Sequence, residues 1–141
     1  MAREIKVQNN MPWDSLNIAE CDAVLLRFQG HVVAGAAIRA KVVDEVVSQI
    51  QAEGGGVNTI LAHIHERRTR LNRLRETAFA YWAKHEYARA INGFEAYLQL
   101  LGSAPDVESM QACNEAKAII RGHKRGRVRR FWGLLFAAIV V

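Results

Sequence analysis

The sequence predicts an all-α fold, a bundle of about five helices. Only two prolines interrupt its 141 residues, and apolar side chains recur every three or four positions along most of the chain. No segment alternates apolar with polar residues over the length of a strand. We expect three parts: an N-terminal arm over residues 1–13, one helical domain over residues 14–121, and a basic linker followed by an apolar tail over residues 122–141.

A first helix is predicted over residues 16–28, where apolar side chains are dense. A side-chain oxygen of Asp14 or Ser15 can accept hydrogen bonds from the free N–H groups of its first turn. Gly30 and Gly35 indicate a break or kink, because glycine weakens a helix interior by about 1 kcal/mol relative to alanine.

An amphipathic stretch follows over residues 36–51, in which apolar residues recur at intervals of four. Its many valines suggest a strand as the competing interpretation, but about 16 residues without a turn signal is long for one strand. The glycines at positions 54–56 then end the helix and make a hinge. Whether residues 16–53 form one bent helix or two stays open.

The longest helix is predicted to begin at a cap formed by Asn58 or Thr59 and to end near Lys84. Apolar residues recur every seven positions along it, which is typical of a helix packed along one seam. The seam residues are Ile64, Leu71 and Ala78. Five arginines are expected on the outer face of this helix: Arg67, Arg68, Arg70, Arg73 and Arg75.

Two further helices complete the domain. Residues 87–101 place apolar side chains at spacings of three and four, which makes one continuous helical face, and Gly102 is positioned as the C-terminal cap. Pro105 and Asp106 suit the start of a last helix that ends near Arg121.

Small residues on the helix that ends near Lys84 and on the helix over residues 87–101 would allow these two helices to approach each other closely. Ala78 and Ala90 would let the antiparallel helices meet while Tyr81 and Phe94 fill the groove between them. The same pattern includes Tyr87, Ile91 and Leu98. This spacing, from Leu74 to Pro105, resembles one tetratricopeptide hairpin. Thr77 and Tyr97 depart from the usual leucine and alanine of that repeat.

The basic residues are concentrated near the end of the chain. Six of the 19 lysines and arginines lie within residues 121–130, so residues 1–120 carry a net charge of 13 − 14 = −1. That asymmetry argues against a uniformly basic nucleic-acid-binding protein. Residues 131–141 follow with no polar side chain except the indole of Trp132.

This apolar tail predicts a membrane role. As a helix, 11 residues reach roughly 16 Å, about half of the ~30 Å hydrocarbon core. The tail can therefore belong to a longer native segment, dip into one leaflet, or form the last helix of a soluble core. We favour the membrane, because basic residues directly before an apolar helix suit anionic headgroups. The predicted membrane-contacting residues are Arg127, Arg129, Arg130, Phe131, Trp132, Leu134, Leu135 and Phe136.

The order of a hairpin, a further helix, a basic linker and an apolar tail over residues 74–141 resembles the mitochondrial fission adaptor family. The resemblance implies a tail anchor in the outer mitochondrial or peroxisomal membrane and a concave surface for protein partners. The N-terminal half of the chain does not match this family, and the tail is shorter. Protein-contacting side chains are expected at Tyr81, Trp82, Tyr97, Arg67, Arg70 and Arg73.

Together these features predict a membrane-anchored interaction adaptor without catalytic activity, cofactor or metal. His63 and His65 are two apart and point to different sides of a helix, while Cys21 and Cys113 are expected to be reduced, buried thiols. Without a secretory signal at its start, the chain is expected not to be secreted.

Two alternative functions remain. One is a structural accessory subunit of a large membrane complex, for example a mitochondrial one. The other is a nucleic-acid-binding helical protein, which is disfavoured because no aromatic residue that could stack on bases is interleaved among the arginines.

Overall fold

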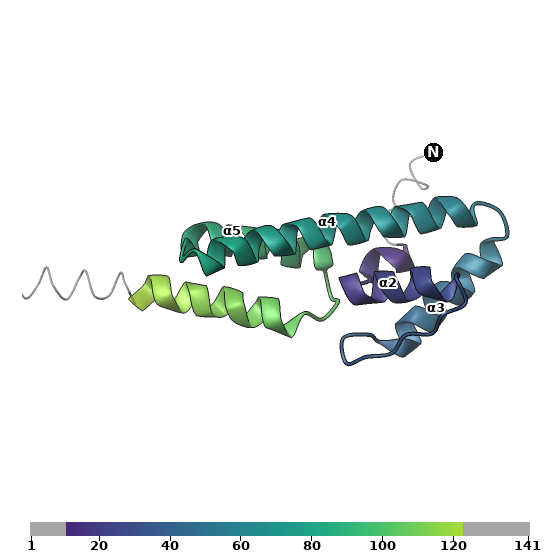
Figure 1. Ribbon diagram of the computed structural model, residues 1–141, viewed down its shortest axis with the longest axis horizontal. Coiled ribbons are helices and arrows are strands. Elements are labelled where there is room, and N and C mark those ends of the chain that lie inside the picture. Colours follow the sequence, from purple (N-terminus) through teal and green to yellow (C-terminus); the bar gives the residue numbers. More distant parts are fainter. Residues whose placement is uncertain (1–10, 123–141) are drawn as a thin grey trace, which may run out of the picture.

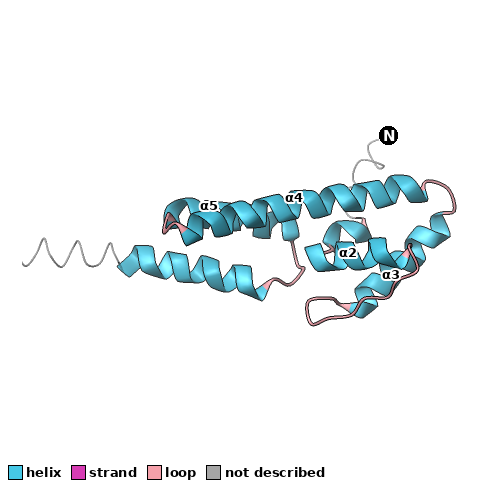
Figure 2. Ribbon diagram, viewed as in Figure 1, coloured by secondary structure: helices cyan, strands magenta, loops and turns pink. Residues whose placement is uncertain are grey.

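The computed structural model describes residues 11–122, and all regular structure in that range is helical (Figure 2). The elements are η1 (Pro12–Ser15), α2 (Ile18–Arg27), α3 (Ala40–Glu53), α4 (Val57–Ala83) and α5 (Tyr87–Leu101). A last helix covers residues 107–122 and is called the C-helix below. The predicted all-α class with five α-helices is confirmed for this part of the chain. The apolar tail and most of the N-terminal arm lie outside the described residues.

Residues 16–53 form two helices, and a loop over residues 28–39 separates them. The first of these, α2, is capped by Asn17, so the expectation of a cap at Asp14 or Ser15 is wrong. The Asn17 side chain accepts from the Glu20 N–H at 2.7 Å, and the Glu20 carboxylate accepts from the Asn17 N–H at 3.0 Å. This reciprocal capping box satisfies two free N–H groups at once, which neither predicted residue does.

The glycine hinge sets the boundary between α3 and α4. Gly54 follows α3 with φ of 70°, and Gly56 precedes α4 with φ of 78°. These left-handed backbone conformations suit glycine. Because Gly56 already occupies the N-cap position without a side-chain hydrogen bond, the predicted cap at Asn58 or Thr59 is wrong.

The long helix α4 is the spine of the molecule. Its 27 residues span about 40 Å, with α2 and α3 packed along its first half and α5 and the C-helix along its second (Figure 1). The predicted seam is confirmed, since Ile64, Leu71 and Ala78 are fully buried. One apolar cluster lies among α2, α3 and the start of α4. Two others lie among α4, α5 and the segments that follow α5.

The hairpin of α4 and α5 has the close approach that the small residues predict. A Cβ atom at Gly93 would lie 3.0 Å from the Ala78 Cβ, and both Ala78 and Ala90 are fully buried. The C-helix packs against this pair through Ala112 and Cys113. The bounds of α5 and its Gly102 cap are as predicted.

Candidate partner-binding surface

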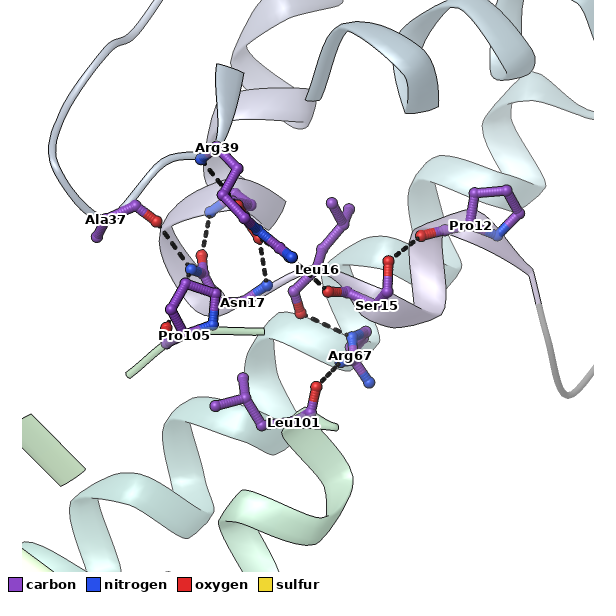
Figure 3. Close-up of polar contacts among 10 residues, drawn as sticks. Pro12, Ser15, Leu16, Asn17, Ala37, Arg39, Arg67, Leu101 and Pro105 are labelled. Atoms are coloured by element: carbon purple, nitrogen blue, oxygen red, sulfur yellow. Dashed lines mark hydrogen bonds and ion pairs between the residues drawn. The ribbon is translucent and has the colours of Figure 1, made fainter. Parts of the chain in front are cut away.

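Arg67 joins the two halves of the molecule (Figure 3). Its side chain donates from Nε to the Leu16 carbonyl at 3.0 Å, from Nη1 to Leu100 at 3.2 Å and from Nη2 to Leu101 at 3.4 Å. The last two carbonyls lie in the final turn of α5, where helix carbonyls lack intrahelical partners. Burial lowers the pKa of the Arg67 guanidinium.

The prediction that Arg67 lies on the outer face of α4 is therefore wrong. The residue is only 8% exposed, because it follows Ile64 by three positions and precedes Leu71 by four, which places it in the buried seam. Its guanidinium already donates to three carbonyls of the chain itself, and its contact with a partner stays a prediction.

The remaining arginines of α4 do not form one basic face. Arg68 donates to Asp22 at 2.8 Å, and Arg75 donates to Asp106 and Glu108, both at 3.0 Å. Only Arg70 and Arg73 of the five are exposed. The five arginines therefore do not form the continuous row of cations that a nucleic-acid interface along this helix would need.

Tyr97 is also buried, at 1% exposure, but it lines a groove between the two halves of the molecule, so its role in partner binding stays a prediction. Its hydroxyl donates to the Asp106 carboxylate at 2.6 Å. Burial and this hydrogen bond raise the pKa of Tyr97. The Ser109 hydroxyl donates to the same carboxylate at 2.9 Å and the Ser109 N–H donates at 3.1 Å, so Asp106 caps the C-helix, whose start was predicted at this position.

Asp106 remains an anion despite its environment. Burial alone would raise the pKa of its carboxyl, but hydrogen bonds from Tyr97, Ser109 and Arg75 outweigh that effect and lower the pKa. This polar cluster fixes the start of the C-helix against α4 and α5.

Tyr81 and Trp82 lie near the end of α4 and are half-buried. Both pack against the cluster that contains Ala78 and Phe94. The Trp82 Nε1 atom is buried and finds no hydrogen-bond partner among the described residues, while the Arg89 guanidinium lies 5.8 Å from the Tyr81 ring centre. Their role in partner binding stays a prediction.

A groove of about 550 Å³ opens where the two halves meet. Its walls come from α2, the loop before α3, α4, α5 and the start of the C-helix. The lining residues are Asn17, Ile18, Ala19, Asp22, Ala36, Ala37, Asn72, Arg75, Tyr97, Pro105, Asp106, Val107 and Glu108. No spacing in the sequence indicates this groove, because five separate segments build it.

Asn17 ties two of the groove walls together (Figure 3). Its side-chain amide donates to the Ala37 carbonyl at 2.8 Å and to the Pro105 carbonyl at 3.4 Å. One residue thus caps α2 and holds both the loop before α3 and the segment before the C-helix.

Glu20 fixes the loop from the other side. Its fully buried carboxylate accepts from the Arg39 backbone N–H at 2.9 Å and from the Arg39 side-chain Nε at 2.7 Å. Burial would raise the pKa of Glu20, but the hydrogen bonds from Arg39 and from the Asn17 N–H outweigh it, so the pKa is lowered.

Both cysteines and His63 lie within the described part of the chain. Both cysteines are free and buried, as expected, and burial raises the pKa of Cys21 to about 12. His63 contacts Asp14 at 2.7 Å, and no group of three metal-ligating side chains occurs within residues 11–122. Within residues 11–122, no helix has both the length and the apolar character needed to span a bilayer. The predicted lipid-contacting residues from Arg127 to Phe136 lie outside the described part.

Comparison with known proteins adds no relative. No protein-family model matches the chain, and no curated protein or solved structure is significantly similar to it. The surface must be interpreted from its own chemistry.

Proposed function

We propose that the chain is a membrane-associated helical adaptor in which residues 11–122 bind a protein and residues 123–141 contact lipid. The observation that carries this proposal is the course of the C-helix. Its first residues, Val107 and Glu108, line the groove, and the helix then runs along the α4–α5 hairpin to residue 122 at the far end of the body (Figure 1). The basic and apolar segments follow directly in the sequence.

The course of the C-helix would keep protein binding and lipid contact at opposite ends of this helix. The 16 residues of the C-helix span about 24 Å, so the groove lies at one end of this helix and the start of the basic segment at the other. An adaptor held to lipid through residues 123–141 would keep its groove free for a partner.

The tail sequence supplies the chemistry for lipid contact. Arg127, Arg129 and Arg130 would each contribute about 1 kcal/mol near an anionic surface. Trp132 suits the headgroup region, and the leucines and phenylalanines that follow suit the acyl chains. An outer mitochondrial location, implied by the family resemblance, remains part of the proposal.

Vesicle flotation of the purified chain tests the lipid contact. The full-length chain is expected to float with protein-free vesicles that contain anionic lipid, and a chain lacking residues 123–141 is expected to stay at the bottom. The circular dichroism of the truncated chain serves as the control that the helical body is intact. Flotation of the truncated chain would exclude the tail as the lipid-binding element.

The same assay separates an accessory subunit from an adaptor. Exposed apolar side chains at Val32, Val33, Val107 and Met110 favour assembly with another protein. A subunit that depends on its complex would be found in cell membranes yet would not float with protein-free vesicles.

A further inference from the structure

The groove between the two halves has the composition of a peptide-binding site. Alanines, Ile18, Pro105 and Val107 supply apolar walls. A volume of about 550 Å³ falls within the ~300–1,000 Å³ range of ligand sites. The groove is open rather than enclosed, so it suits a segment of chain better than a small molecule.

The groove is acidic although the chain as a whole carries a charge of +5. Its lining holds three carboxylates and one guanidinium, and a second guanidinium, that of Arg68, lies 2.8 Å from Asp22 at its edge, which leaves a net charge of 2 − 3 = −1. Arg75 is engaged with Asp106 and Glu108, and the Glu108 side chain is 73% exposed. The Asp22 side chain is 42% exposed. Arg68 and Arg75 each contact one of these two carboxylates, but both carboxylate side chains remain partly exposed, and a cationic group gains the most from approaching them.

An exposed apolar side chain lies in the lining of the same groove. Only four large hydrophobic residues are exposed within residues 11–122, and Val107, at 63%, is one of them and lies in the lining. Two others, Val32 and Val33, belong to the loop that continues into the groove wall at Ala36. Exposed apolar surface that is rimmed by polar residues is typical of a protein-binding site.

We propose that this groove docks a segment of a partner protein that inserts an apolar side chain between Ile18 and Val107 and places Arg or Lys on Asp22 and Glu108. An acidic peptide or a nucleic acid has the wrong charge. The inference deepens the proposed adaptor function and rests on it, since it names the chemistry of the adaptor's partner.

Selection from a phage-displayed random peptide library on the full-length chain in detergent tests the proposal. Enriched peptides are expected to combine apolar residues with Arg or Lys. Glu108→Lys is expected to weaken the binding of an enriched peptide about tenfold at low ionic strength, and Glu108→Gln less. Enrichment of acidic peptides would overturn the proposal.

A matched control lies on the same helix. Glu115→Lys makes the same charge change at an exposed position outside the groove lining and is expected to leave binding unchanged. Equal effects of the two variants would show nonspecific attraction and refute the groove. If the groove is instead covered by a second copy of the chain, no peptide is enriched and Glu108→Lys changes the sedimentation coefficient, which also refutes the proposal.

Different results would refute the proposed lipid contact and the proposed peptide binding in the groove. A chain that does not float with vesicles but binds basic peptides through Glu108 loses only the lipid contact. A chain that floats but binds no peptide in a manner dependent on Glu108 loses only the groove.

Discussion

Replacing Gly93 with alanine measures how closely α4 and α5 are packed. The added Cβ would lie 3.0 Å from the Cβ and 3.2 Å from the Cα of Ala78. Carbon atoms rest about 3.5–4.0 Å apart, and alanine has no rotamer through which to escape. The two helices must therefore separate by several tenths of an ångström.

Two opposing effects decide whether Gly93→Ala raises or lowers the free energy of unfolding. Alanine stabilises a helix interior by about 1 kcal/mol relative to glycine, whereas overpacking a close contact costs about 1–3 kcal/mol. Because one of the two contacts at Gly93 is with backbone, we expect the cost to exceed the gain. The predicted result is a loss of about 1 kcal/mol in the free energy of unfolding.

Urea denaturation followed by circular dichroism measures this loss. Gly122→Ala is the control, because no atom lies within 4 Å of its added Cβ, and it is expected to be neutral or slightly stabilising. Ala78→Gly should relieve the contact, so a double-mutant cycle should give a favourable coupling of about 1 kcal/mol. Stabilisation by Gly93→Ala alone, with no coupling, would refute the packing argument.

Three other predictions concern buried polar groups. Arg67→Met removes the donor from three carbonyls, two of which belong to the buried residues Leu16 and Leu101, and is expected to lower the free energy of unfolding by about 2–4 kcal/mol. Arg70→Met on the surface should change it by less than about 0.5 kcal/mol, and equal effects of the two variants in denaturation would contradict this. Glu20→Gln should destabilise by about 2 kcal/mol at neutral pH. Because the folded-state pKa of Glu20 is lowered from 4.5, its contribution is present above that pH and is lost as the pH falls through the folded-state value. Wild-type and variant stabilities should then converge in acid, and a constant difference would argue against the ion pair. With a pKa of about 12, the Cys21 thiol should react with Ellman's reagent at pH 8 only through unfolding; fast labelling of a folded Cys113→Ser chain would show that it is accessible.

Approximate helix positions follow from local spacing, which is why the bounds of α5 could be predicted closely, whereas α3 begins at Ala40 and not at residue 36. Apolar positions three and four apart define a face regardless of what packs on it. The residue that caps a helix N-terminus is harder to predict when several polar residues lie close together in the sequence before that helix. The spacing of Asn17 and Glu20 does carry a capping-box signal, yet Asp14 and Ser15 precede it and were equally plausible.

The groove and the burial of Arg67 depend on distant segments. The heptad register of Arg67 between Ile64 and Leu71 is a signal in the sequence, but a charged residue in a seam is unusual without knowledge of its partners. Those partners are carbonyls of Leu16 and of the end of α5, far away along the chain. Likewise, only the assembled fold brings Asp22 and Glu108 to one hollow.

The continuity of α4 gives the groove a mechanical property. One wall belongs to the segments packed on the first half of this helix and the other to those packed on its second half. Both walls are therefore attached to one continuous helix of 27 residues. A partner that forces the walls apart strains the hydrogen bonds that cross between the two halves, from Asn17 to Pro105 and from Arg67 to the end of α5. Bulky occupants are then resisted by these bonds, whereas a slender segment enters without breaking them.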